Sequence, residues 1–75
     1  MAEVRLPDLG KVEEVTIVGW LKKEGETVKA AEDLLEVETE KTTFVIESPA
    51  SGKIVKITKK EGERAKLDEL LAEIG

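Results

Sequence analysis

Lys41 is the residue whose setting in this sequence points most directly to chemistry. It stands in the stretch "EVETEKTTFVIESP" at 36–49, between an acidic alternating run and an apolar alternating run. The chain has no cysteine and no histidine, which excludes thiol chemistry and removes the commonest general base and metal ligand. The acidic residues of "EVETE" do not have the spacing of a calcium-binding loop. We therefore predict no metal site and no catalytic residue, and the Lys41 amine is the candidate reactive group.

A lysine amine at the tip of a turn is suited to carrying a covalently attached group. It would reach into solvent on a flexible four-carbon stem while the strands below hold its base. Schiff-base catalysis instead needs a desolvated lysine with a lowered pKa, which a turn does not provide. The plain alternative is that Lys41 only keeps an exposed turn soluble, and the residue pattern by itself leaves both interpretations open.

The residues on both sides of Lys41 alternate with the period of a β-strand. Residues 35–40 alternate glutamates with apolar or hydroxyl side chains, and residues 43–47 alternate again after a break at "TEKT". A helix would scatter the three glutamates around its surface, whereas two strands place them on one outward face. The pattern predicts a β-hairpin with Lys41 at its tip.

The chain contains an internal repeat. "IVGWLKKEGETVKAAEDLLEVE" (17–38) aligns without gaps on "IVKITKKEGERAKLDELLAEIG" (54–75), with identical residues at eleven of the twenty-two positions. Because solenoids need about three or more units, two copies predict a compact domain with pseudo-twofold symmetry. Lys41 follows the first copy, so we expect a closed turn at one end of the domain and the chain termini at the other. The first half also has five extra residues, 11–15, before its copy of the repeat.

The choice between strand and helix is ambiguous in the repeat. "RAKLDELLAEI" at 64–74 has apolar residues at helical spacing, and symmetry transfers the ambiguity to the first copy. Trp20 is expected to pack at a sheet edge rather than to bind a ligand. The predicted core consists of Leu6, Ile17, Val28, Leu35, Val37, Phe44, Ile46, Ile54 and Ile74.

Length and charge narrow the functional classes. The 75 residues predict one domain, 1–75, and the net charge of −5 argues against nucleic-acid binding. No apolar run approaches the ~20 residues that span a bilayer, and the N-terminus lacks the features of a signal peptide. The absence of cysteine fits a reducing compartment, so we expect a cytoplasmic protein without membrane contact.

The whole chain resembles a lipoyl domain of the biotinyl/lipoyl carrier superfamily, as found in the acyltransferase component of 2-oxo acid dehydrogenase complexes. The matching segments are "LPDLG", "TIVGWLKKEGETV", "LLEVETEKTTFVIESPASGKI", "KKEG" and "LLAEIG". "ETEK" resembles the Glu-Thr-Asp-Lys around the family's lipoylated lysine, and Gly25 and Gly52 are spaced like its turn glycines. The resemblance implies an all-β fold, a flattened barrel of two four-stranded antiparallel sheets related by a pseudo-twofold axis, and overrides the helical spacing of 64–74.

The resemblance also implies the function. Lys41 would carry lipoate in amide linkage to its Nζ, attached by a lipoate–protein ligase or a lipoyl-attaching transferase. As a swinging arm it would serve a thiamine-diphosphate-dependent 2-oxo acid decarboxylase, an acyltransferase catalytic domain and dihydrolipoyl dehydrogenase. Glu38, Glu40 and Thr42 would contribute to recognition, and 11–15 would form a loop beside the hairpin that helps to select the decarboxylase. We expect a non-catalytic, monomeric domain excised from a longer chain.

The sequence departs from the family pattern at four positions. Glu40 replaces the usual Asp, Thr42 replaces a small residue, and Ala31 and Asp68 replace glycines in turns. Because alanine adopts positive φ poorly, we expect the turn at Ala31 to differ.

Other interpretations remain at this point. One is a biotinyl carrier domain, whose lysine is typically flanked by methionines. Another is the lipoyl carrier of glycine cleavage, which is normally a longer chain. A third is an unmodified, lipoyl-like interaction module.

Overall fold

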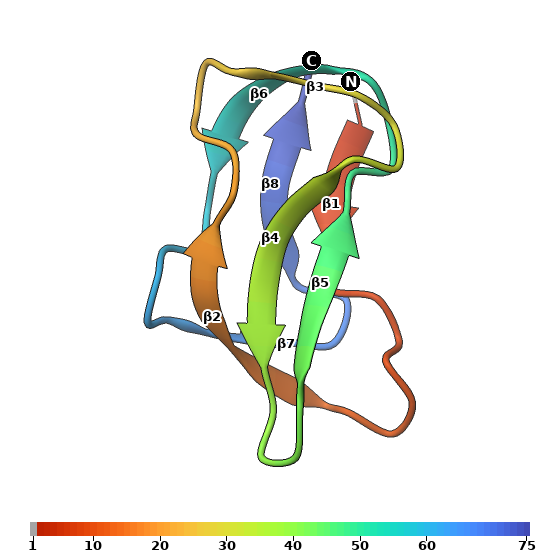
Figure 1. Cartoon of the computed structure of the whole chain (residues 1–75), viewed down its shortest axis with the longest axis vertical. Coiled ribbons are helices and arrows are strands. Elements are labelled where there is room, and N and C mark those ends of the chain that lie inside the picture. Colours follow the sequence, from red (N-terminus) through yellow and green to blue (C-terminus); the bar gives the residue numbers. More distant parts are fainter. Residues whose placement is uncertain (1) are drawn as a thin grey trace.

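All regular secondary structure in residues 2–75, the part of the chain that the computed structural model describes, is β-strand (Figure 1). The strands are β1 (Ala2–Arg5), β2 (Glu14–Trp20), β3 (Thr27–Val28), β4 (Asp33–Glu38), β5 (Thr43–Glu47), β6 (Gly52–Ile57), β7 (Arg64–Lys66) and β8 (Leu70–Ile74). The helical spacing of 64–74 thus belongs to two short strands, and no helix that could span a membrane occurs in the described range.

Two four-stranded antiparallel sheets have equivalent strand orders. One sheet is ordered β1-β8-β6-β3 and the other β5-β4-β2-β7. Strands β2 and β4 of the first repeat copy therefore occupy the places that β6 and β8 occupy in the other sheet. The short strands β3 and β7 each pair in the sheet built mainly from the other copy. The predicted fold class and its pseudo-twofold symmetry are confirmed, and Figure 1 shows the termini at the end opposite the β4–β5 turn.

The core lies between the two sheets. Eight of the nine predicted core residues are buried, and the ninth, Phe44, is half-buried and packs against them. The further buried hydrophobic residues are Val4, Val15, Leu34, Ala65, Leu71 and Ala72. The side chain of Trp20 is partly buried at the end of β2, where its indole N–H donates to the Lys59 carbonyl at 2.7 Å, in keeping with a packing role.

Irregularities in strand register recur at equivalent places in the repeat. In β4 and β8, Leu34 and Leu71 have no partner in the register with the neighbouring edge strand. Each is fully buried and adjacent in sequence to a second buried residue. In β2 and β6, Val18 and Val55 have no partner in the register with β4 and β8, and they are 40% and 51% exposed. A β-bulge of this kind inserts one residue and reverses the alternation of faces. Strict alternation therefore holds only between the bulges.

Four turns of the form Lys-x-x-Glu join the strands, at 23–26, 29–32, 60–63 and 66–69. In each, the glutamate N–H donates to the lysine carbonyl at 3.0 Å, and a glutamate Oε1 accepts the lysine N–H at 2.7–2.9 Å. The third residue has positive φ, as a type II turn requires. Its φ is 91° at Gly25, 69° at Ala31, 88° at Gly62 and 66° at Asp68.

The expectation that the turn at Ala31 would differ is wrong. Ala31 keeps the left-handed conformation because hydrogen bonds to Ser48 hold the turn. The Ala31 N–H donates to the Ser48 carbonyl and the Ser48 N–H donates to the Glu32 carbonyl, both at 2.8 Å. At the equivalent turn, the Asp68 N–H donates to the Leu6 carbonyl at 2.9 Å.

Replacing Ala31 with glycine should stabilise the domain. Glycine removes the steric cost of the left-handed conformation but gains freedom in the unfolded chain, so the net gain in unfolding free energy should be about 0.5–1 kcal/mol. Ala30→Gly is the matched control, since φ at Ala30 is not positive and glycine there should destabilise. Urea denaturation followed by circular dichroism measures both changes. A destabilised Ala31→Gly variant would contradict this account.

Two ion pairs occupy equivalent places in the two halves. Lys22 pairs with Glu32 at 3.4 Å and Lys59 with Glu69 at 2.8 Å. The Lys59 ammonium, followed by the Lys66 N–H, holds the pKa of the Glu69 carboxyl below its ordinary value of 4.5. The Lys29 N–H, followed by the Lys22 ammonium, lowers the pKa of Glu32 in the same way. Hydrogen bonding to Glu69 raises the pKa of Lys59 above 10.5.

The Glu69 contribution to stability should depend on pH. A carboxyl whose pKa is lower in the folded state stabilises the fold above its unfolded pKa, and this contribution is lost as pH falls through the folded value. The wild type should therefore be more stable than Glu69→Gln at pH 7, and the difference should shrink below pH 4.5. Chemical denaturation across this range tests it, with Glu61→Gln as a control outside the ion pairs of the described residues. A difference independent of pH would contradict the assignment.

Candidate functional site

Lys41 lies at the exposed tip of the β4–β5 hairpin, as the alternating pattern predicted. The last cross-strand pair is Glu38 with Thr43, and the chain reverses in the four residues between them. The hairpin projects from the body of the domain in Figure 1, away from the termini. The amine is thus displayed on the part of the hairpin that extends beyond the strand pairing.

Hydrogen bonds from one hydroxyl organise this turn. The Thr39 Oγ1 accepts the N–H of Lys41 at 3.3 Å and of Thr42 at 3.1 Å, and its O–H donates to the Thr42 carbonyl at 3.0 Å. The Thr39 N–H donates to the same carbonyl at 2.8 Å. Thr39 was not among the predicted site residues. The signal that could have found it is the preference of threonine for bonding its hydroxyl to nearby backbone N–H groups in turns.

The loop between β1 and β2 lies beside the hairpin, and an open groove of about 790 Å³ separates them. The loop occupies 6–13. The predicted loop at 11–15 is therefore partly wrong, because Glu14 and Val15 already belong to β2, where Val15 is buried opposite Ala65 of β7.

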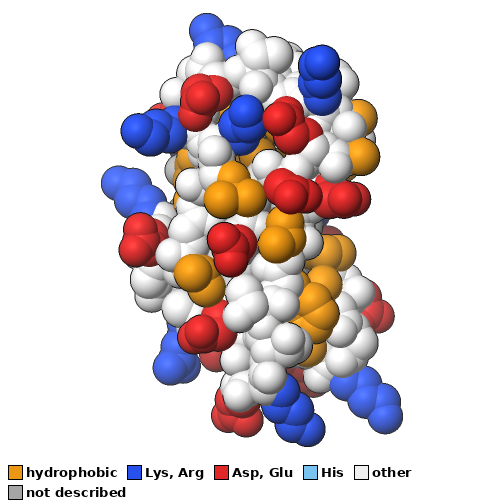
Figure 2. Space-filling model, in the orientation of Figure 1, with side chains coloured by type: hydrophobic (Ala, Val, Ile, Leu, Met, Phe, Trp, Pro, Cys, Tyr) orange, Lys and Arg blue, Asp and Glu red, His pale blue; other side chains and the backbone are white. Residues whose placement is uncertain are grey.

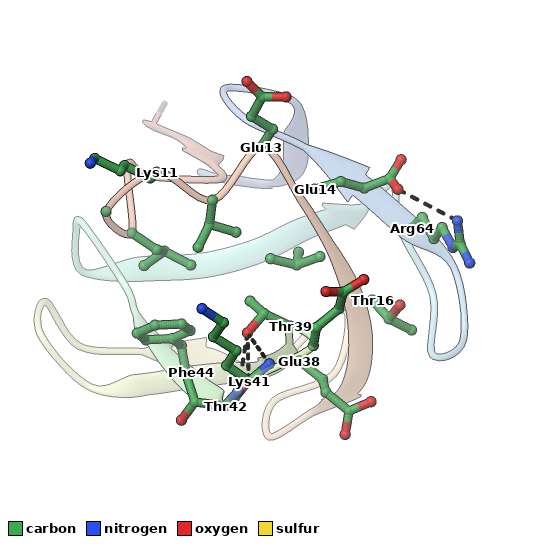
Figure 3. Close-up of a pocket in the computed structure, with 15 residues that line it drawn as sticks. Lys11, Glu13, Glu14, Thr16, Glu38, Thr39, Lys41, Thr42, Phe44 and Arg64 are labelled. Carbon is green, nitrogen blue, oxygen red and sulfur yellow. Dashed lines mark hydrogen bonds and ion pairs between the residues drawn. The ribbon is translucent and has the colours of Figure 1, made fainter.

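The groove has an apolar floor and polar walls. Leu9, Val12 and Phe44 line it and pack against the core. The Arg64 guanidinium pairs with the Glu14 carboxylate at 3.5 Å at one side. Figure 3 shows Lys41 and Phe44 on the hairpin side of this groove and Lys11 on the loop across from them. The loop thus forms a second surface next to the Lys41 tip.

The structure brings the predicted recognition residues together with Lys41. Glu38 ends β4, Glu40 and Thr42 flank Lys41, and all three are exposed and line the groove. Arg64 was not predicted here. Arg64 lies beside the groove because Thr16 of β2 pairs with Glu38 of β4 on one side and with Arg64 of β7 on the other. Its position therefore depends on the pairing of β7 with β2.

The surface around the site carries charged side chains of both signs. In the face that Figure 2 shows, acidic and basic side chains alternate with small apolar patches. Among residues 2–75 there is no group of three or more acidic side chains placed to hold a metal ion. What the hairpin tip offers chemically is the exposed amine of Lys41.

Comparison with known proteins identifies the family. A family model described as "Biotin-requiring enzyme" matches residues 2–74. The solution structure of the lipoyl domain of the 2-oxoglutarate dehydrogenase complex from Azotobacter vinelandii is similar, with a TM-score of 0.80 and 30% sequence identity, covering 100% of this chain and 96% of that one. The chain belongs to the biotinyl/lipoyl carrier family. Its predicted resemblance to lipoyl domains is confirmed.

Sequence relatives of this lipoyl domain are acyltransferase components. It is 44% identical over 73 residues to the dihydrolipoyllysine-residue succinyltransferase component of the 2-oxoglutarate dehydrogenase complex of Rickettsia conorii. It is 43% identical over 74 residues to the dihydrolipoyllysine-residue acetyltransferase component of the pyruvate dehydrogenase complex of Corynebacterium glutamicum. These matches cover 96% and 97% of the chain but only 18% and 11% of the relatives.

Proposed function

We propose that this domain is the lipoyl carrier of a 2-oxo acid dehydrogenase complex and that lipoate is attached to Lys41. The observation that carries the proposal is the position of Lys41, exposed at the tip of the β4–β5 hairpin. The names of the relatives, which contain "dihydrolipoyllysine-residue", favour lipoate over biotin as the attached group.

The residues present fit this attachment. The Lys41 Nζ would hold the lipoyl group through an amide bond to its carboxyl carbon, once the attaching enzyme has activated that carboxyl with ATP and released pyrophosphate. The lysine ammonium would lose two protons to solvent and keep one as the amide N–H, and AMP would leave from the carboxyl carbon. When bound, the lipoyl group supplies a dithiolane that accepts an acyl group with two electrons and later releases both.

The protein's own contribution is presentation. The hairpin fixes the base of the Lys41 side chain, and the lysine stem supplies reach. Tethering raises the effective concentration of the attached group at each active site that the domain visits. Those sites would belong to a thiamine-diphosphate-dependent decarboxylase, an acyltransferase domain and dihydrolipoyl dehydrogenase. The domain itself would catalyse no step.

Residues around the tip would select the partners. Glu38, Glu40 and Thr42 stand at the surface that any enzyme approaching the Lys41 side chain must meet. The loop at 6–13 forms a second surface across the groove. Relatives from two different complexes are almost equally similar, so the proposal does not extend to one 2-oxo acid.

Modification should require Lys41 and no other lysine. After incubation with lipoate, ATP and a lipoate–protein ligase, the intact mass of the wild type should rise by one lipoyl group. Lys41→Arg should show no gain, because a guanidinium keeps the charge but does not form the amide. Lys11→Arg is the matched control from the same groove and should be modified like the wild type.

A parallel incubation with biotin, ATP and a biotin ligase tests the rival carrier. Biotinylation of the wild type without lipoylation would replace lipoate by biotin in this account. If neither enzyme modified the folded domain, the carrier proposal would be overturned in favour of an interaction module.

A further inference from the structure

We infer that Thr39 is a positioning residue for the modification of Lys41. Its hydroxyl holds the turn in the conformation that the attaching enzyme binds. The inference rests on the proposed function, since it concerns how efficiently Lys41 is modified.

The contacts of Thr39 use the full bonding capacity of its hydroxyl. A hydroxyl has one donor and two acceptor positions. Here the donor goes to the Thr42 carbonyl at 3.0 Å, and the acceptors take the N–H groups of Lys41 at 3.3 Å and Thr42 at 3.1 Å. One side chain therefore holds the backbone of the target lysine and of the residue after it.

The Lys41 turn is built differently from the four Lys-x-x-Glu turns. Each of those has a residue with positive φ and closes with a backbone bond from its fourth N–H to its first carbonyl. Positive φ outside glycine occurs in the described chain at Lys11, Ala31 and Asp68, so Glu40 and Lys41 keep negative φ. The Thr42 N–H here donates to a hydroxyl. The one backbone bond across this turn runs from the Thr39 N–H to the Thr42 carbonyl at 2.8 Å, and the Thr39 hydroxyl supplies the other three bonds. Removing the hydroxyl should therefore loosen the turn without changing the strands below it.

Loosening the turn should lower affinity for the attaching enzyme. If the enzyme binds only one conformation, its apparent affinity is reduced by the fraction of molecules in that conformation. The Michaelis constant for the domain then rises while kcat stays the same, because the bound complex is unchanged. A residue needed only for global stability would not produce this pattern in a domain that remains folded.

Thr43 provides a matched control in the same hairpin. It is exposed, pairs with Glu38 across the strands and takes no part in the bonds that hold the turn. Thr39→Val and Thr43→Val remove the same hydroxyl group, and only the first removes the three side-chain bonds that organise the turn. Thr39→Ser keeps the hydroxyl and should restore the wild-type behaviour.

The experiment measures lipoylation kinetics by intact mass with lipoate, ATP and a lipoate–protein ligase, for the wild type and these three variants. Thr39→Val should raise the Michaelis constant about tenfold with kcat unchanged. Thr39→Ser and Thr43→Val should stay within about twofold of the wild type. Amide hydrogen exchange on the unmodified proteins gives an independent readout. In Thr39→Val, exchange should accelerate at Lys41 and Thr42 and stay unchanged at the buried Val37.

Equal Michaelis constants for the wild type and Thr39→Val would overturn the positioning role and leave the proposed function intact. An equal loss in Thr43→Val, or no recovery in Thr39→Ser, would also overturn it, as would faster exchange at Val37 matching that at Lys41. A wild type that is not modified at Lys41 would overturn the proposed function and the positioning role together.

Discussion

Burial of β4 is the constraint on which the rest of the structure depends. Leu34, Leu35 and Val37 have no exposed surface, and β4 pairs with β2 on one side and β5 on the other. Shifting this strand by one residue would turn its apolar side chains toward solvent and its glutamates inward. Its register and its end at Glu38 are therefore fixed. The chain must reverse just beyond, and this reversal sets the position of Lys41.

The pseudo-twofold symmetry explains why the domain has one such tip. Equivalent strands, bulges, turns and ion pairs recur in both halves, so the body is built twice from nearly the same residues. At the place equivalent to the β4–β5 turn the chain is open, and the two termini lie there (Figure 1). Departures from the symmetry gather around Lys41. They are the turn held by the Thr39 hydroxyl and the loop at 6–13.

Much of the fold and site was predictable because alternation is a direct consequence of strand geometry. It located the hairpin, its tip and most of the core. Alternation does not predict burial where bulges reverse the faces, so it predicted neither the burial of Leu34 nor the exposure of Val18. The turn at Ala31 was misjudged because local propensity was overridden by hydrogen bonds from distant residues. Arg64 reaches the groove through a strand pairing that a single sequence does not reveal, and Thr39 was overlooked although its type favours such turns.

The central claim is that the place of the lysine in the hairpin, and not its mere presence, makes this domain a carrier. Exchanging the two residues in the double variant Glu40→Lys/Lys41→Glu keeps composition, charge and turn length while moving the amine by one position. Intact-mass measurement with a lipoate–protein ligase, on protein shown to be folded by circular dichroism, tests the claim most directly. The account predicts no lipoyl gain in the exchanged variant. Modification as efficient as that of the wild type would contradict it.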